Sequence, residues 1–313
     1  MLGAKVYGTT IVVIFTWFFG CHVAQAQSLG RFVGGNFVVE DRLIRFHINR
    51  SAGGQIDYLY NKTRQTQYLR GNGYYYLAGT GADSFGGNYY QSYDQASNFR
   101  IIENNNTQAV IEVAGNLVTP PVTNRRSLGV AYLRRYTYRR DSMAISVSHA
   151  LRFDTTVRLN QLSATLDVDE DVNCRYYSWG LTEYWMGAAR SWRRFTSNSR
   201  VFSGLIDYPS GFTGFDNLGR MFLPARANLA ENKATIFSPG RGGISREFQD
   251  PRSFQSITFW TNPKSANLRA KSLEAHFLNT DAKWVLSGSR DGSSFNISQG
   301  TVLRANEVLR ISN

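Results

Sequence analysis

Cysteine is almost absent from this chain. Only Cys21 and Cys174 occur among 313 residues, and Cys21 lies in an N-terminal segment that we expect to be removed. Cys174 alone cannot form an intramolecular disulfide, and no paired-cysteine metal motif is present. We interpret Cys174 as a small buried hydrophobe in preference to a reactive thiol, so packing must hold the fold without covalent cross-links.

Several catalytic motifs are also missing. The sequence contains no GxSxG or HExxH pattern. The glycine-rich run at 240–245 (GRGGIS) lacks the lysine and the strand-to-helix context of a phosphate-binding loop. No recognition motif or basic low-complexity tail points to nucleic acid, so we expect no nucleic-acid partner. Because these motifs are missing, the sequence predicts no cofactor.

Long apolar runs are missing except at the N-terminus. Lys5 precedes an apolar stretch at 10–20 (TIVVIFTWFFG), and small residues follow at 24–26 (AQA). The stretch is too short to favour a membrane span, and the pattern is typical of a secretory signal peptide. We predict cleavage after Ala26 and a secreted, periplasmic or extracellular mature chain. Lipidation at Cys21 is the alternative, which the bulky Phe18 and Phe19 disfavour.

Charge is unevenly distributed between the two signs. Lysine and arginine total 35 against 23 acidic residues, a formal net charge of +12, and 29 of the basic residues are arginine. Arginine presents a planar fork that pairs with carboxylates and sulfates. The surplus is either a basic surface without a specific role or a sign of an anionic partner. For an exported protein that partner is acidic polysaccharide or a cell-surface glycan.

Long helical periodicity is absent, and short alternating runs take its place. Residues 37–48 and 55–60 predict a hairpin, and residues 128–138 and 143–153 predict a second pair of antiparallel strands. In the strand 143–153 the odd positions are apolar apart from His149, as in a half-buried strand. Further strands are expected at 101–102, 109–113, 158–168, 256–261, 273–278, 284–287 and 301–311, with a short helix around Thr182–Arg190.

No Pro- or Ser-rich linker interrupts the pattern, so residues 27–313 are expected to form a single all-β domain, a large antiparallel β-sandwich with few short helices. Its strands resemble those of the galactose-mutarotase-like β-supersandwich superfamily. The resemblance rests on residues 36–61 (NFVVEDRLIRFHINRSAGGQIDYLYN), 130–153 and the tail GTVLRANEVLRISN. It covers most of Gly35–Asn313. It implies a supersandwich fold of the kind found in aldose epimerases and polysaccharide lyases, although the epimerase histidines and carboxylate match no specific positions.

Only three histidines follow the expected signal peptide, so each is considered in turn. His149 lies on the apolar side of its strand, where it is either a core histidine or a general base at a cleft edge. His47 shares the polar side of its strand with Arg45 and Asn49, which makes either a sugar-binding row or a solvated face. His276 shares its side with Glu274, which we interpret as a surface pair.

Elimination from a uronic acid polymer needs a cation to neutralise the carboxylate, a base and an acid. The chain supplies these residue types in Arg134 and Tyr136, with His47 or His149 as further acid–base candidates. Hydrolysis needs paired carboxylates. The acidic run at 167–171 reads first as a turn, with Ca²⁺ as a weaker alternative because the glycine and terminal glutamate of an EF-hand are missing.

A second cluster combines aromatic residues with arginine and one acid. Trp179, Trp185 and Glu183 are candidates for stacking and hydrogen bonding to sugar rings, although the tryptophans equally suit the core. The sequence therefore predicts an exported protein that binds or acts on acidic polysaccharide, with lyase chemistry if it is an enzyme. The alternative is a non-catalytic extracellular structural or adhesion protein that self-assembles.

Overall fold

The computed structural model describes residues 28–80, 87–121, 126–159, 161–167, 176–179, 181–186, 191–194, 201–203, 221–227, 233–238, 242–249, 254–261, 270–277 and 295–313. These residues form antiparallel strands, joined in the described ranges by a single short helix, the 3₁₀ turn η1 (Arg50–Ala52). The predicted all-β sandwich is confirmed. The predicted signal peptide and Cys174 lie outside the described residues, as does the strand expected at 284–287. Within the described ranges no helix has the length and apolarity to span a membrane.

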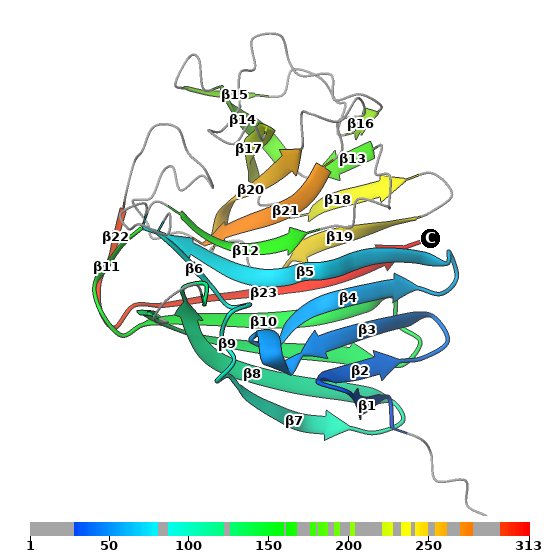
Figure 1. Ribbon diagram of the computed structural model, residues 1–313. Coiled ribbons are helices and arrows are strands. Elements are labelled where there is room, and N and C mark those ends of the chain that lie inside the picture. Colours follow the sequence, from blue (N-terminus) through cyan, green and yellow to red (C-terminus); the bar gives the residue numbers. More distant parts are fainter. Residues whose placement is uncertain are drawn as a thin grey trace, which may run out of the picture.

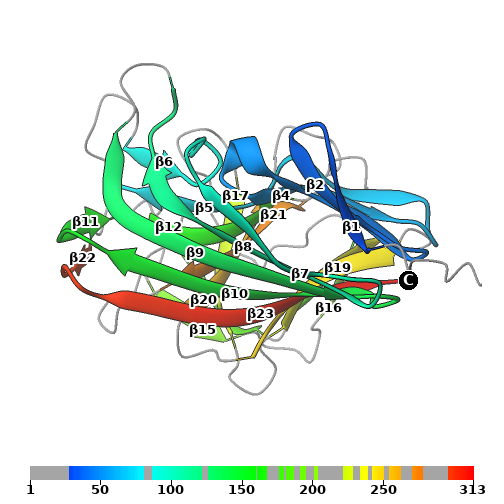
Figure 2. The same cartoon turned by 90° about the horizontal axis from the view of Figure 1, so that it is seen from below.

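Two large antiparallel sheets face each other (Figures 1 and 2). The first sheet contains, in spatial order, β1 (Gly30–Val33), β2 (Asn36–Glu40), β3 (Ile44–Asn49), β4 (Gln55–Asn61), β5 (Thr66–Gly79), β12 (Gln161–Asp167), β21 (Ala270–Phe277), β20 (Phe254–Thr261), β17 (Met221–Ala227), β14 (Leu181–Met186) and β15 (Ser191–Arg194).

The second sheet contains β7 (Asn98–Asn104), β8 (Gln108–Val118), β9 (Ser127–Arg139), β10 (Ala144–Phe153), β23 (Val302–Ser312), β19 (Gly242–Phe248), β18 (Lys233–Ser238), β13 (Tyr176–Trp179) and β16 (Val201–Ser203). The short strand β6 (Asn88–Tyr90) pairs with both β5 and β8 and so joins the two sheets. A separate small sheet pairs β11 (Val157–Leu159) with β22 (Phe295–Ile297).

The core lies between the two sheets, and strict alternation builds it. On β3, Ile44, Phe46 and Ile48 are fully buried, whereas Arg45 and His47 between them are half-buried. On β10, every second residue from Ile145 to Phe153 is buried, and the residues between are exposed or half-buried. Alternation therefore directs one side of each strand into the core, as the sequence predicts.

The turn between β3 and β4 depends on its glycines. Gly53 and Gly54 adopt positive φ angles of 62° and 69°, which L-residues with a Cβ rarely adopt. A Cβ at Gly53 would lie 2.1 Å from the carbonyl oxygen of Gln91. The hairpin predicted at 37–60 is confirmed, and its glycines allow the turn to pack closely against the loop after β6.

One predicted element is wrong. The helix expected around Thr182–Arg190 is absent over its first residues, because Leu181–Met186 forms strand β14. This strand pairs with β15 and β17. Tyr184 and Trp185 are aromatic residues that favour strands, and pairing with a neighbour on each side satisfies their backbone better than an isolated helical turn.

Candidate functional site

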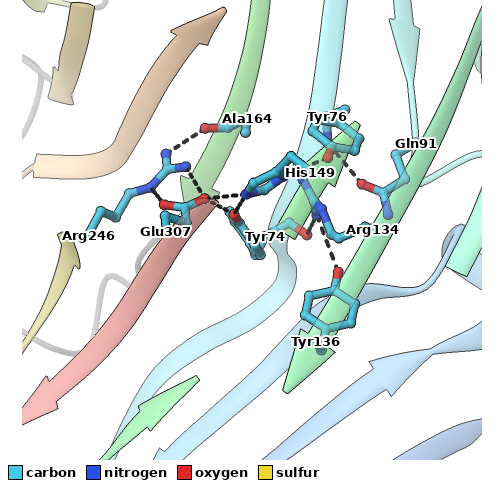
Figure 3. A network of polar contacts seen from close by, with 9 residues as sticks. All are labelled: Tyr74, Tyr76, Gln91, Arg134, Tyr136, His149, Ala164, Arg246 and Glu307. Carbon is cyan, nitrogen blue, oxygen red and sulfur yellow. Dashed lines mark hydrogen bonds and ion pairs between the residues drawn. The ribbon is translucent and has the colours of Figure 1, made fainter. Parts of the chain in front are cut away.

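Three neighbouring strands of the second sheet each place one polar residue on their core-facing side. Arg134 on β9, His149 on β10 and Glu307 on β23 lie among apolar and aromatic neighbours, and all three are almost completely buried. Figure 3 shows that they meet residues from the first sheet and from β19 in one connected network. The members of this buried network are Tyr74, Tyr76, Gln91, Arg134, Tyr136, His149, Ala164, Arg246 and Glu307.

His149 is held on both ring nitrogens. Its Nε2 lies 2.7 Å from Glu307 Oε1 and 2.8 Å from the hydroxyl of Tyr74, and its Nδ1 lies 2.6 Å from the hydroxyl of Tyr76. A carboxylate only accepts hydrogen bonds, so the Nε2 proton points to Glu307 and Nδ1 accepts from Tyr76. Burial lowers the pKa of His149 to about 4, against the raising effect of Glu307. The imidazole is therefore neutral at neutral pH.

Glu307 is the anion of the network. Arg246 binds it through two parallel hydrogen bonds, Nε to Oε2 at 2.6 Å and Nη2 to Oε1 at 2.7 Å. The hydroxyl of Tyr74 also donates to Oε1, and the remaining Arg246 nitrogen donates to the carbonyl of Ala164 at 2.6 Å. Burial raises the pKa of Glu307, but Arg246 and His149 outweigh it and hold that pKa well below its usual range. The pair joins β19 and β23 to β12 across the core.

Arg134 is the cation of the network without a carboxylate partner. Its guanidinium carbon lies 3.8 Å from the ring centroid of Tyr76 and 4.2 Å from that of Tyr74, a cation–π arrangement. Its Nη1 donates to the carbonyl of Tyr74 at 3.0 Å and to the hydroxyl of Tyr136 at 3.3 Å. The hydroxyl of Tyr136 in turn donates to the carbonyl of Gly54. Aromatic faces, one carbonyl oxygen and one hydroxyl thus replace a counterion.

The network brings together three of the predicted site residues, His149, Arg134 and Tyr136. All three side chains are buried between the sheets, so the geometry gives them a clear structural role in joining the sheets. A buried polar network favours one packing arrangement of a core, although Nε and Nη2 of Arg134 have no hydrogen-bond partner among the described residues. The catalytic role expected of His149 and Tyr136 stays a prediction, as does the ligand-binding role of Arg134.

The predicted row Arg45–His47–Asn49 lies elsewhere, on the side of β3 that points away from the core. Arg45 Nε donates to His47 Nε2 at 3.1 Å. The His47 ring stacks on Tyr58 of β4, with centroids 4.4 Å apart and planes at 20°. Burial, and then the charge of Arg45, lower the pKa of His47. Arginine and imidazole therefore form one unit on the outer face.

Asn49 has a different task from its two neighbours. Its Oδ1 accepts from the backbone N–H of Ser51 at 2.9 Å and so caps η1, and its Nδ2 donates to Asp57 Oδ2 at 2.7 Å. Both ends of the amide are thus occupied by the hairpin itself. Of the three residues in the row, Arg45 and His47 are the ones available for a ligand.

The predicted aromatic cluster is divided between the sheets. Trp179 lies on β13 of the second sheet, opposite Ala234. Trp185 and Glu183 lie on β14 of the first sheet, with Trp185 opposite Trp192 and Glu183 opposite Arg194 and Arg226. The side chains of these three residues lie outside what the structure describes, so their sugar-binding role stays a prediction.

Sequence reasoning missed four network members that carry its contacts: Tyr74, Tyr76, Arg246 and Glu307. One signal could have found Glu307. The residues at 303, 305, 309 and 311 of its strand are all apolar, and Glu307 is the lone charge among them, as His149 is on β10. No local pattern distinguishes Arg246 or the tyrosines, because most of their partners in the network lie 60 or more residues away along the chain.

Strand register adds a second polar location, on the outer face of the first sheet. His276 of β21 lies opposite Ser163 of β12 and Ser256 of β20, and Glu274 lies opposite Thr165 and Thr258. Directly opposite residues share one face of a sheet.

That face points away from the core between the sheets, and the side chains of Ser163 and Thr165 on it are buried, with exposures of 0% and 2%. Ser163 and Thr165 alternate with Leu162, Ala164 and Leu166 of the core, and their hydroxyls lie 3.3 Å apart. A carboxylate position and an imidazole position are therefore flanked by hydroxyl residues on both neighbouring strands. We call positions 163, 165, 256, 258, 274 and 276 the hydroxyl rows.

Metal binding has no support among the described residues, where no three or more His, Cys, Asp and Glu residues group together as ligands. Of the acidic run considered for Ca²⁺, only Asp167 belongs to the described residues, and positions 168–171 lie outside them.

Comparisons with known proteins locate the fold. No family model matches the sequence, and no curated protein matches it. Solved structures do match. A galactose mutarotase related enzyme from Lactobacillus acidophilus shares 10% identity over 89% of this chain and 97% of its own, with a TM-score of 0.53.

Two further solved structures agree. A galactose mutarotase-like protein from Lactobacillus casei shares 13% identity over 88% of this chain and 100% of its own, with a TM-score of 0.53. Another from Clostridium acetobutylicum shares 11% identity over 93% and 99%, with a TM-score of 0.51. The architecture expected from the sequence is thereby confirmed: this chain has the galactose-mutarotase-like fold.

Proposed function

We propose that this chain is an exported protein that binds acidic polysaccharide and cleaves it by β-elimination. The observation that carries the proposal is the register of the hydroxyl rows, which places a carboxylate residue and an imidazole residue two positions apart on the side of the first sheet that points away from the core. The mutarotase-like fold and the net charge of +12 support a carbohydrate that bears negative charge.

The reaction would proceed without an added oxidant or cofactor. A base takes the C5 proton of a uronate unit, the electrons of that C–H bond form the C4=C5 double bond, and the C4–O bond breaks. The leaving oxygen takes a proton from an acid. Glu274 and His276 are the residues proposed for these two proton transfers, because carboxylate and imidazole are common general bases and acids.

The test is incubation of the purified chain with a panel of uronate polymers, followed by the ultraviolet absorbance of new unsaturated ends. We expect absorbance to rise with at least one polymer and the rise to be lost in Glu274→Gln and His276→Gln. Glu247→Gln is the matched control, because Glu247 pairs with Arg310 near the solvent on the second sheet. Polymers that all stay intact and unbound would overturn the proposal.

A non-catalytic, self-assembling extracellular protein is the second candidate. The observation in its favour is strand β7, which pairs only with β8 among the described residues and exposes Ile101 and Ile102 at 41% and 45%. Exposed apolar residues on an edge strand favour pairing between chains. A β-bulge at this point of β7 opposes regular pairing. Light scattering after size exclusion measures the oligomeric state of the purified chain. Oligomers without polymer cleavage support this candidate, and a monomer excludes it.

A further inference from the structure

We propose that Arg45, His47, Tyr58 and Tyr60, here called the Arg45 patch, form a subsite for a carboxylate-bearing sugar unit of a polymer, remote from the hydroxyl rows. The inference rests on the proposed function, because it assigns the part of the outer face that recognises the negative charge. The patch lies on β3 and β4, on the side facing away from the core, and all four side chains are half-buried.

Arg45 is a cation whose hydrogen-bonding capacity is largely unused. Its Nε donates to His47, and its two Nη groups donate to no other described residue. The fork that pairs with a carboxylate consists of such N–H groups. Because His47 holds Nε, the guanidinium is fixed in one orientation with its outer edge available.

The carboxylate of Glu40 on the neighbouring strand neutralises Arg45 only in part, because Lys62 and Arg31 act on it as well. Glu40 of β2 lies opposite Arg45 in the sheet, but its two oxygens bind Lys62 at 2.7 Å and Arg31 at 3.1 Å. Two cations therefore share the charge of Glu40, and Arg45 adds a third positive charge next to them. Arg70 of β5 lies opposite Tyr58, on the strand at the other side of the patch.

Aromatic rings hold the patch rigid and give it an apolar side. His47, Tyr58 and Tyr60 form a stacked series: the centroids of Tyr58 and Tyr60 lie 6.4 Å apart, with planes at 21°. Tyrosine presents a ring for apolar contact and a hydroxyl for hydrogen bonding, and it loses little side-chain entropy on binding. A pre-organised guanidinium beside aromatic rings suits a ligand with a carboxylate on an otherwise neutral ring.

The separation from the hydroxyl rows indicates a polymer. From β3 to β21 the sheet runs through β4, β5 and β12, which at the usual strand spacing is about 19 Å. A single sugar ring cannot span that distance. A ligand that reaches both locations must be a chain of sugar units crossing the strands of the first sheet.

The experiment measures binding of uronate oligomers of increasing length by isothermal titration calorimetry, with the same oligomers after carboxyl reduction as neutral ligands. We expect Arg45→Gln to weaken binding of long uronate oligomers by about tenfold or more, the usual loss for a charge-assisted hydrogen bond, and to leave the reduced oligomers unaffected. Arg45→Lys keeps the charge but not the fork, so its loss should be intermediate.

Arg152→Gln is the matched control, because it removes an exposed arginine from β10 of the opposite sheet, where Arg152 pairs with Asp154. Its binding should differ from that of the native chain only by the small loss that one unit of net charge causes. If the native chain binds uronates and Arg45→Gln binds them equally well, the subsite is wrong and the proposed function stands. If the native chain binds no uronate, the proposed function fails first. Unfolding curves of each variant establish that the fold is intact.

Discussion

His149 is a titratable residue that the fold keeps neutral. Burial lowers its pKa to about 4 in the folded chain from an ordinary value of 6.5. The unfolded chain therefore takes up a proton at a higher pH than the folded chain. Stability from this group is complete above about pH 6.5 and is lost as the pH falls towards 4, by up to about 1.4 kcal/mol per pH unit. The lowered pKa of Glu307 acts in the same direction at still lower pH.

We therefore expect urea unfolding between pH 4 and 7 to show a free energy of unfolding that decreases on acidification, and a smaller slope in His149→Gln. His47→Gln serves as the comparison: the pKa of His47 is also lowered, but its ring is half-exposed. Its slope should change less. Equal slopes in the native chain and His149→Gln would show that this imidazole already titrates normally in the fold.

The Glu307–Arg246 pair should be strongly coupled, because neither side chain has access to water. Removing one partner leaves a buried charge without its counterion, so Glu307→Gln should cost about 3–5 kcal/mol of unfolding free energy. The double variant Glu307→Leu with Arg246→Met removes both charges and should cost less than the sum of Glu307→Leu and Arg246→Met measured singly. A double-mutant cycle in urea measures this coupling, and additivity within about 0.5 kcal/mol would contradict it.

At the scale of elements, a glycine in the β3–β4 turn and a glycine in the β1–β2 turn allow the cost of backbone strain to be separated from the cost of close packing. Gly53 and Gly34 have nearly equal positive φ angles, 62° and 59°, but a Cβ would clash with the Gln91 carbonyl at Gly53 and meet nothing at Gly34. Gly34→Ala should therefore cost about 1 kcal/mol from the backbone alone.

Gly53→Ala should cost clearly more, about 2–4 kcal/mol, since the clash adds to the same backbone term. The two thermal unfolding midpoints, measured side by side, report the difference. Equal midpoints would mean that the loop after β6 moves away at little cost, and that this turn does not position it.

The strands themselves could be predicted because alternation is local. The register of β9 with β10 follows from a four-residue turn and a buried parity, and both are visible in the sequence. The helix expected at Thr182 failed because pairing with β15 and β17 decides that segment, and those partners cannot be read from its own residues.

The buried network could be predicted only in part for the same reason. Arg134 and His149 lie directly opposite each other on adjacent strands, and this pairing can be predicted from the turn between the strands and their alternation. Arg246 and Glu307 meet them only after β19 and β23 have been placed in the sheet. Contacts between distant strands depend on topology, which a single sequence does not specify residue by residue.

For the whole molecule, the net charge of +12 leads to a prediction about salt. Attraction between a basic protein and a polyanion is screened as ionic strength rises, because the Debye length shrinks from about 10 Å at 0.1 M to about 3 Å at 1 M. Affinity for a uronate polymer should fall steadily with added sodium chloride, whereas affinity for its carboxyl-reduced counterpart should stay level.

The variants then separate overall charge from local recognition. Arg152→Gln and Arg45→Gln lower the net charge equally, so long-range attraction should weaken by the same small amount in both. Only Arg45→Gln should also lose affinity at high salt, where screening has removed the long-range term and the contact at a fixed guanidinium remains. Identical salt curves for the two variants would mean that charge alone attracts the polymer, and that no single arginine on the outer face recognises it.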